Sequence, residues 1–155
     1  MEPWANTDRI VCNNYYFASV GAAETLREIG LLFIGVVKTA TKLFPMRYLS
    51  KIELVNRGDR PGIITEDADG LPSLLAFTWI DRDRRYFIAS CSSLTEGQPY
   101  IRERWRQVGR EDPNADPEKV ELHIPQPKIA KKFYSTAARV DQHNRDRQDT
   151  QKMKK

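Results

Sequence analysis

The sequence predicts an α/β domain, and three features of the chain support this fold class. A short apolar run, a capped helix and a longer apolar run follow one another between Arg9 and Val37. Short β-prone segments then alternate with turns rich in Asp, Gly and Arg, a pattern typical of antiparallel hairpins. A final amphipathic segment begins near Pro127. A length of 155 residues, with 40% hydrophobic and 30% charged residues, suits one domain.

The first predicted unit is a strand, a helix and a second strand. Arg9–Cys12 ("RIVC") predicts a short buried strand, and Ser19 is placed to cap a helix that continues to about Ile29. Gly30 suits the residue that ends this helix. Leu31–Val37 ("LLFIGVV") is continuously apolar, which predicts a strand buried on both faces. We expect the two strands to be parallel, with a right-handed connection.

The middle of the chain predicts strands joined by tight turns. One helical turn is expected after Pro45, before the runs "GIIT", "LPSLLAFTWI" and "RRYFIASCSS", which predict antiparallel hairpins. Asp67–Gly70 ("DADG") resembles the start of a calcium loop, but the full loop spacing with a distal Glu is absent. We therefore expect a hairpin turn there. Gly109–Lys119 predicts a polar loop that contains proline.

The final helix is predicted from Pro127, which suits a first-turn position. Its buried face is predicted from apolar residues at helical spacing: Ile129, Phe133, Ala137 and Val140. Asp141 lies four residues past Ala137 at the edge of this stripe, and Asn144 follows on the same side. From Asn144 onward the chain is polar and basic, and we expect its end to be frayed.

Composition narrows the functional classes. The net charge of +4 is compatible with nucleic-acid binding but indicates it only weakly, because Asp and Glu are also plentiful. Cys12 and Cys91 show no framework spacing, which favours a reduced, intracellular setting. No apolar run approaches the length of a membrane span, and the first residues, "MEPWANTDR", do not resemble a signal peptide. We therefore expect no membrane partner.

Two asparagines and three aromatic residues follow the first predicted strand. The ends of strands in α/β layers are common positions for ligands and metals. Because Asn is the uncharged isostere of Asp, Asn14 can stand where a carboxylate belongs. The alternative is that Asn14 is a polar residue that caps the turn between strand and helix, a role that Asn commonly fills.

Four motifs, in order, resemble the transposase domain of PiggyBac transposable element-derived proteins. The segment "NNYYFAS" is similar to the one that holds the family's second catalytic Asp, and it places Asn14 at that position. "GVVKTATKLFP" (Gly35–Pro45) resembles the stretch after the next strand, and "WIDRDRRYFIASCSS" resembles a hairpin of the family's β-rich insertion. "FYSTAARVDQHNR" resembles the helix of the third catalytic Asp, with Asp141 at that position and Asn144 at a further acid position.

The resemblance implies a partial RNase H-like core, made of the strand–helix–strand unit and the C-terminal helix and interrupted by a β-rich insertion. On this division residues 1–44 and 126–148 form the core, 45–125 form the insertion and polar loop, and 149–155 form a basic disordered tail. The family's first catalytic Asp lies on an earlier strand, so we expect a truncated domain. That strand lies beside Arg9–Cys12 in the full fold, and we expect the edge to be open here and prone to pair with other chains.

The resemblance implies metal-dependent DNA cleavage and strand transfer as the ancestral activity, with Mg²⁺ or Mn²⁺ as the cofactor. It implies that Asn14 and Asp141 occupy catalytic positions and that Asp141 and Asn144 occupy metal-binding positions. Two divalent ions need several anionic oxygen ligands, and Asp141 is the one carboxylate among these three. We therefore expect no two-metal site and an inactive chain, with DNA binding as the residual role. The alternative for Asp141 is a solvated acid paired with a neighbouring Arg.

Basic residues supply candidate DNA contacts. Lys38 and Lys42 lie in the matched stretch and are candidates for phosphate contacts, the alternative being a solvated loop. The run Arg102–Arg106 alternates basic residues with Glu103 and Trp105, which suits either nucleic acid or, as we favour, a charged surface with one anchored Trp.

A second functional hypothesis is a non-catalytic protein-interaction module that pairs with an intact transposase or a chromatin protein. The resemblance also implies a nuclear location, DNA as a partner and no small-molecule substrate. Whether the chain is an enzyme stays open at this point, because the resemblance names a transposase and the available carboxylates predict inactivity.

Overall fold

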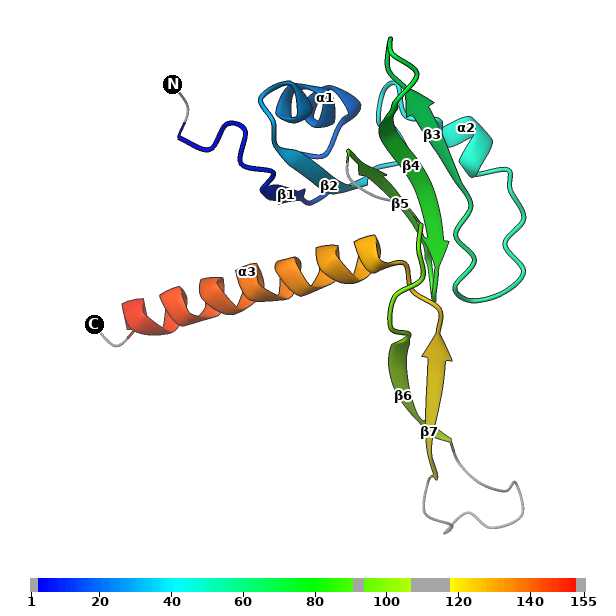
Figure 1. Ribbon diagram of the computed structural model, residues 1–155. Helices are drawn as coiled ribbons and strands as arrows, with labels where there is room; N and C mark the ends of the chain where they lie inside the picture. Colours follow the sequence, from blue (N-terminus) through cyan, green and yellow to red (C-terminus); the bar gives the residue numbers. More distant parts are fainter. Residues whose placement is uncertain (1–2, 91–93, 107–117, 153–155) are drawn as a thin grey trace.

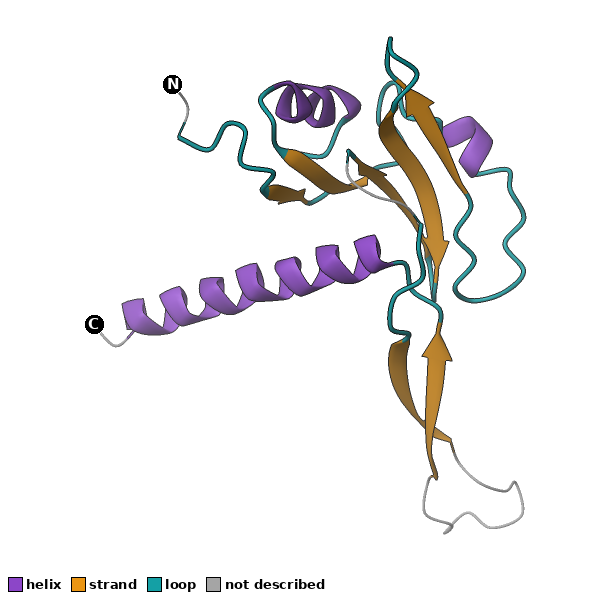
Figure 2. Cartoon of the chain, viewed as in Figure 1, coloured by secondary structure: helices purple, strands orange, loops and turns teal. Residues whose placement is uncertain are grey.

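The computed structural model describes residues 3–90, 94–106 and 118–152 (Figure 1). Over these residues the chain forms a five-stranded mixed sheet, a separate two-stranded hairpin and three helices (Figure 2). This architecture confirms the predicted α/β fold class. It is compatible with a partial RNase H-like core, in which a strand–helix–strand unit and a C-terminal helix accompany a β-rich segment.

The predicted strand–helix–strand unit is present as β1 (Ile10–Asn13), α1 (Val20–Glu28) and β2 (Leu32–Val37). β1 and β2 pair in parallel, as expected. The Oγ of Ser19 accepts a hydrogen bond of 3.1 Å from the backbone N–H of Ala22, which is the predicted N-cap.

Two glycines determine how α1 is placed against β2. Gly30 has φ of +70°, a backbone angle that glycine adopts without strain, and it follows the end of α1. At Gly35, in β2, an added Cβ would lie 2.7 Å from the Cβ of Ala18 and 2.9 Å from ring atoms of Phe33. The absence of a side chain at Gly35 therefore lets the chain entering α1 pack directly on the strand.

The rest of the large sheet comes from the middle of the chain. A short helix, α2 (Met46–Leu49), precedes β3 (Gly62–Glu66), β4 (Pro72–Ile80) and β5 (Arg84–Ala89). The strand order is β1-β2-β5-β4-β3, and β5 is antiparallel to both β2 and β4. The hairpins are thus confirmed, and Asp67–Gly70 forms the turn between β3 and β4 rather than a calcium loop.

The final elements are a hairpin of β6 (Tyr100–Arg106) and β7 (Glu118–Ile124) and the long helix α3 (Lys128–Lys152). The hairpin extends away from the large sheet, and α3 crosses beneath β2 and β1 (Figure 1). Most of the predicted loop at Gly109–Lys119 lies outside the described residues, and the last two residues of this loop belong to β7. Cys91 also lies outside the described residues.

The predicted division into core, insertion and tail stays a prediction. Segment 45–125 contributes β3, β4 and β5 to the same sheet as β1 and β2, and α3 is described as far as Lys152, inside segment 149–155. None of the described helices has the length and apolarity needed to span a membrane.

The core has two parts, one on each face of the sheet. On one face, Leu74 and Ala76 of β4 pack with residues from α1 and α2. On the other face, Leu75 and Phe77 pack with residues from α3. β2 contributes to both parts, which confirms that it is buried on both faces. The sheet is therefore the middle layer, with α1 and α2 on one face and α3 on the other. Any site on that second face has α3 as one of its walls.

Two burial predictions are wrong in detail. β1 is only partly buried, because it is an edge strand and, among the described residues, pairs with β2 alone. The predicted apolar stripe of α3 is buried at Ile129 and Phe133, but Val140 is 54% exposed. The reason is that the later turns of α3 extend past β1, where the described sheet ends (Figure 1).

Candidate functional site

A cavity of about 470 Å³ lies at the carboxyl end of β1, between that strand and α3. We call it the strand-end cavity. Its polar wall comes from the residues that follow β1, and its apolar wall comes from α3. The lining residues are Cys12, Asn13, Asn14, Tyr15, Phe17, Val36, Arg85, Phe133, Tyr134, Thr136, Ala137 and Val140.

Asn14 borders this cavity and also stabilises the turn after β1. Its side-chain Oδ1 accepts a hydrogen bond of 3.1 Å from the backbone N–H of Tyr16. Its backbone carbonyl accepts from the N–H groups of Phe17 and Ala18, at 3.1 and 3.0 Å. The turn-capping role is therefore present in the structure. The correspondence of Asn14 to a catalytic Asp remains a prediction.

An exposed cluster of three aromatic residues and a lysine lies beside Asn14. The ring centroids of Tyr15 and Tyr16 are 4.5 Å apart, and the Lys38 Nζ lies 5.0 and 4.3 Å from them. A hydrogen bond and charge interaction with Tyr16 raise the pKa of Tyr15. Tyr16 and Phe17 are 69% and 71% exposed. We call Tyr15, Tyr16, Phe17 and Lys38 the aromatic–lysine cluster, and its accessible rings and charge are suited to stacking with bases and contact with phosphates.

The structure describes the other predicted site residues, Lys42, Asp141 and Asn144, only in part. Lys42 is exposed in the loop between β2 and α2 and does not line the cavity. Asp141 and Asn144 belong to α3, and Asp141 directly follows the cavity residue Val140. The side chains of Asp141 and Asn144 lie outside what the structure describes. Their correspondence to metal ligands, and the alternative of a solvated ion pair, both stay predictions.

Arg85 and Tyr134 line the cavity, although the sequence interpretation gave them no role. Arg85 alternates along β5 with the buried Phe87, so it lies on the sheet face that α3 covers. A charge on this otherwise apolar face is the signal that the sequence offered. Burial is the main cause that raises the pKa of Tyr134, and the nearby Arg85 opposes this shift.

The described lining does not fit a pair of divalent cations. It contains one charged side chain, the cationic Arg85, and no carboxylate. Within the described part of the chain, no three His, Cys, Asp or Glu residues come together as a metal-binding group. Hard divalent ions prefer anionic oxygen ligands, and the Asn14 amide supplies a neutral one. What these residues offer instead is a polar turn, exposed aromatic rings and positive charge.

The basic run in β6 differs from its sequence interpretation. The Arg102 guanidinium forms an ion pair with Asp81, and both side chains are largely buried. Arg104 is exposed, and Trp105 is 70% exposed, so the prediction of an anchored Trp is wrong. The reason is that the β6–β7 hairpin extends away from the sheet, which leaves Trp105 without a core to enter (Figure 1).

The fold and the site together define an α/β domain that is compatible with a partial RNase H-like core and has a cavity at its strand end. Over its whole length, residues 1–155, the chain matches the family model described as Transposase IS4, and it belongs to this family of DDE transposase domains. In general DDE transposases carry out DNA transposition with divalent metal ions. Searches of curated proteins and of solved structures found no match.

Proposed function

We propose that this chain is a PiggyBac-type, catalytically inactive transposase domain whose remaining activity is DNA binding at the strand-end cavity. The observation that carries the proposal is the aromatic–lysine cluster, where Lys38 lies over the rings of Tyr16 and of Tyr15, and Tyr15 lines the cavity. Membership of the DDE transposase family supports DNA as the ligand. A nuclear location is part of the same proposal.

The proposed contact surface carries positive charge in and beside the cavity. Arg85 lies in the cavity wall, Lys38 lies over the ring of the lining residue Tyr15, and Lys42 is exposed in the loop that continues from β2. Phosphates attract such side chains without regard to sequence, and exposed rings add stacking with unpaired bases. This arrangement predicts binding that depends strongly on salt and weakly on DNA sequence.

The proposed loss of catalysis follows from charge. Phosphodiester cleavage by two metal ions requires carboxylates that offset the repulsion between those ions. Asn14 is neutral, and its Oδ1 already accepts a backbone hydrogen bond. Asp141 alone does not supply the missing charge. We expect the purified chain to cut no DNA in Mg²⁺ or Mn²⁺, and metal-dependent cleavage would overturn this part of the proposal.

DNA binding is tested by titrating duplex DNA at several salt concentrations. We expect the affinity to fall steeply with salt, and Lys38→Gln to reduce the logarithmic salt slope by about one. Lys51→Gln is the matched control, because Lys51 is exposed but lies outside the aromatic–lysine cluster. The proposal fails if no duplex binds at low salt, or if the two variants are indistinguishable.

A protein-interaction module is the second candidate function. It is favoured by β6, where Ile101 and Trp105 are exposed apolar residues on a hairpin that extends from the sheet. A partner in this model is an intact transposase or a chromatin protein. Absence of DNA binding at low salt, together with capture of a folded transposase by this hairpin, would favour the module over the DNA-binding domain.

A further inference from the structure

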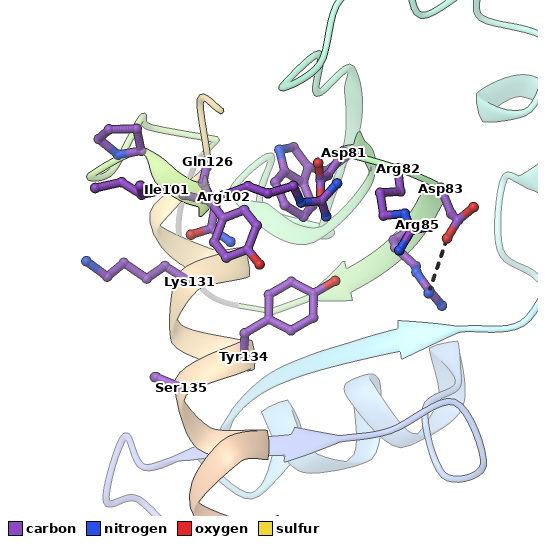
Figure 3. A pocket seen from close by; sticks show the side chains of 13 residues that line it. Asp81, Arg82, Asp83, Arg85, Ile101, Arg102, Gln126, Lys131, Tyr134 and Ser135 are labelled. Carbon is purple, nitrogen blue, oxygen red and sulfur yellow. Dashed lines mark hydrogen bonds and ion pairs between the residues drawn. The ribbon is translucent and has the colours of Figure 1, made fainter. Parts of the chain in front are cut away.

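A second cavity, of about 750 Å³, has no role in the proposed function. Its volume lies within the roughly 300–1,000 Å³ typical of small-ligand sites. Its walls come from the turn after β4, the start of β6 and the first turns of α3 (Figure 3). Arg85 and Tyr134 line both this cavity and the strand-end cavity, so the two are neighbours. We call it the tyrosine cavity.

One side of the tyrosine cavity is aromatic. Tyr134 projects into it from α3 (Figure 3), and Tyr100 lines it from β6, with 38% and 42% of these residues exposed. Trp79 is buried behind them, and its indole N–H donates to the Pro125 carbonyl at 2.9 Å, which fixes the ring. The guanidinium carbon of Arg102 lies 5.8 Å from the centre of the Tyr100 ring. Two accessible, supported rings at one cavity suit a flat aromatic ligand.

The rest of the lining has an excess of positive charge. The ionic side chains are Arg82, Arg85, Arg102 and Lys131, with Asp81 and Asp83. Arg102 is neutralised by its buried ion pair with Asp81. Arg85 is 3.9 Å from Asp83, a long ion pair, and Arg82 is exposed and in no ion pair among the described residues. Figure 3 shows Lys131 on one side of Tyr134 and Arg82 on the other. These charges favour an anion beside the aromatic ring.

We propose that the tyrosine cavity binds one unpaired nucleotide, with its base against Tyr100 and Tyr134 and its phosphate near Arg82 and Arg85. A nucleotide combines the flat ring and the anion that this lining complements. This inference rests on the proposed function: the nucleotide belongs to a DNA strand that lies across the strand-end cavity and continues past Arg85 into the tyrosine cavity. Base–aromatic stacking accepts every base, so we expect no base preference.

The experiment compares three duplexes of equal length by fluorescence anisotropy at one low salt concentration. One duplex is fully paired, one carries a single bulged nucleotide, and one carries a bulged abasic site. We expect the bulged nucleotide to bind about 5- to 150-fold more tightly than the paired duplex, the effect of one stacked base. The abasic bulge should lose most of this gain, because it keeps the flexible backbone but lacks the base.

Three variants test which residues are responsible. Tyr100→Leu should remove most of the preference for the bulge, whereas Tyr100→Phe should keep it because the ring remains. Arg47→Gln controls for a general loss of positive charge, because Arg47 is exposed on α2 and does not line the cavity. It should leave the ratio between bulged and paired duplexes unchanged. The ratio is insensitive to general losses of affinity, and Tyr100→Phe controls for a loss of folding.

The outcomes separate this inference from the proposed function. Binding of all three duplexes with equal affinity overturns the nucleotide site and leaves DNA binding intact. Equal effects of Tyr100→Leu and Tyr100→Phe also overturn it. If no duplex binds, the proposed function fails, and a nucleoside monophosphate is then titrated while the tyrosine NMR signals are followed. Shifts of Tyr100 and Tyr134 in that titration assign the cavity to free nucleotides, and their absence overturns the site altogether.

Discussion

The side-chain Oδ1 of Asn14 lies 3.1 Å from the backbone nitrogen of Tyr16 and accepts its hydrogen bond. This contact closes the turn that begins the wall of the strand-end cavity. We expect Asn14→Ala to lower the free energy of unfolding by about 1 kcal/mol, the net contribution of one such hydrogen bond. Asn14→Asp, which keeps the accepting oxygen, should retain stability. Urea unfolding measures both, and Asn56→Ala, at an exposed site, should have no measurable effect.

The Asn14→Asp variant also tests whether Asp141 faces the cavity. Two carboxylates near one point attract a divalent ion more strongly than one, and about tenfold tighter Mn²⁺ binding is expected from the added charge. Mn²⁺ titration followed by electron paramagnetic resonance provides the measurement. Adding Asp141→Asn to this variant should cancel the gain. A gain that survives this second substitution would show that Asp141 does not contribute to the site.

Stability should depend on pH through Asp67, at the turn between β3 and β4. Its carboxylate accepts the backbone N–H of Leu71 and pairs with Arg27 of α1 at 2.6 Å. These contacts, the Leu71 hydrogen bond first, lower the pKa of Asp67 below its ordinary value of 3.8. The folded state therefore binds a proton less readily than the unfolded state. The stabilisation is complete above that ordinary value and is lost as the pH falls through the folded-state pKa.

Thermal unfolding at neutral and acid pH distinguishes this effect from general acid denaturation. Asp67→Asn should be less stable than the wild type at pH about 7, and the difference should narrow at pH about 3 and below. Asp69→Asn is the control, because Asp69 is exposed in the same turn and is in no ion pair among the described residues. A gap between wild type and Asp67→Asn that is constant with pH would contradict the role of the carboxylate.

The side chain of Phe87, in β5, packs the large sheet against α3. Its ring stacks on Phe77 at a centroid distance of 4.8 Å and meets Phe133 of α3 edge to face at 5.8 Å. Because Phe87 is fully buried, we expect Phe87→Ala to destabilise the protein by about 3–5 kcal/mol. Tyr48→Ala, at an exposed position on α2, should change stability by less than about 0.5 kcal/mol. Denaturant unfolding of both variants provides the comparison.

The local elements were largely predictable, because their signals are carried by neighbouring residues. Ser19 caps the start of α1 and Gly30 follows its end, and the continuous apolar run of β2 is buried on both faces. The turn at Asp67–Gly70 likewise follows from residues that favour tight turns. In each case, the physical cause acts within a few positions of the chain.

The features that were missed depend on contacts between distant segments. The ion pair of Asp81 with Arg102 joins residues about twenty positions apart, and no local pattern identifies it. The exposure of Val140 and Trp105 follows from where the sheet ends, which residue spacing does not reveal. The sequence pointed to the end of the first strand through Asn14, whose role as a site residue stays a prediction, but the contribution of Arg85 to the cavity there required knowledge of which face α3 covers.

The open edge of β1 is expected to promote self-association. β1 pairs with β2 on one side, and among the described residues it has no partner on the other. Ile10, at its start, is an exposed apolar residue, and unpaired backbone groups on such a strand are a template for another chain. We expect Ile10→Lys to shift the protein toward monomer, because a charge on an edge strand opposes pairing. Analytical ultracentrifugation over a range of protein concentrations measures this shift.

Leu71→Lys adds the same charge at an exposed turn outside the strand and should leave the association unchanged. A wild type that stays monomeric at every concentration would contradict the expectation, as would an equal effect of the two substitutions.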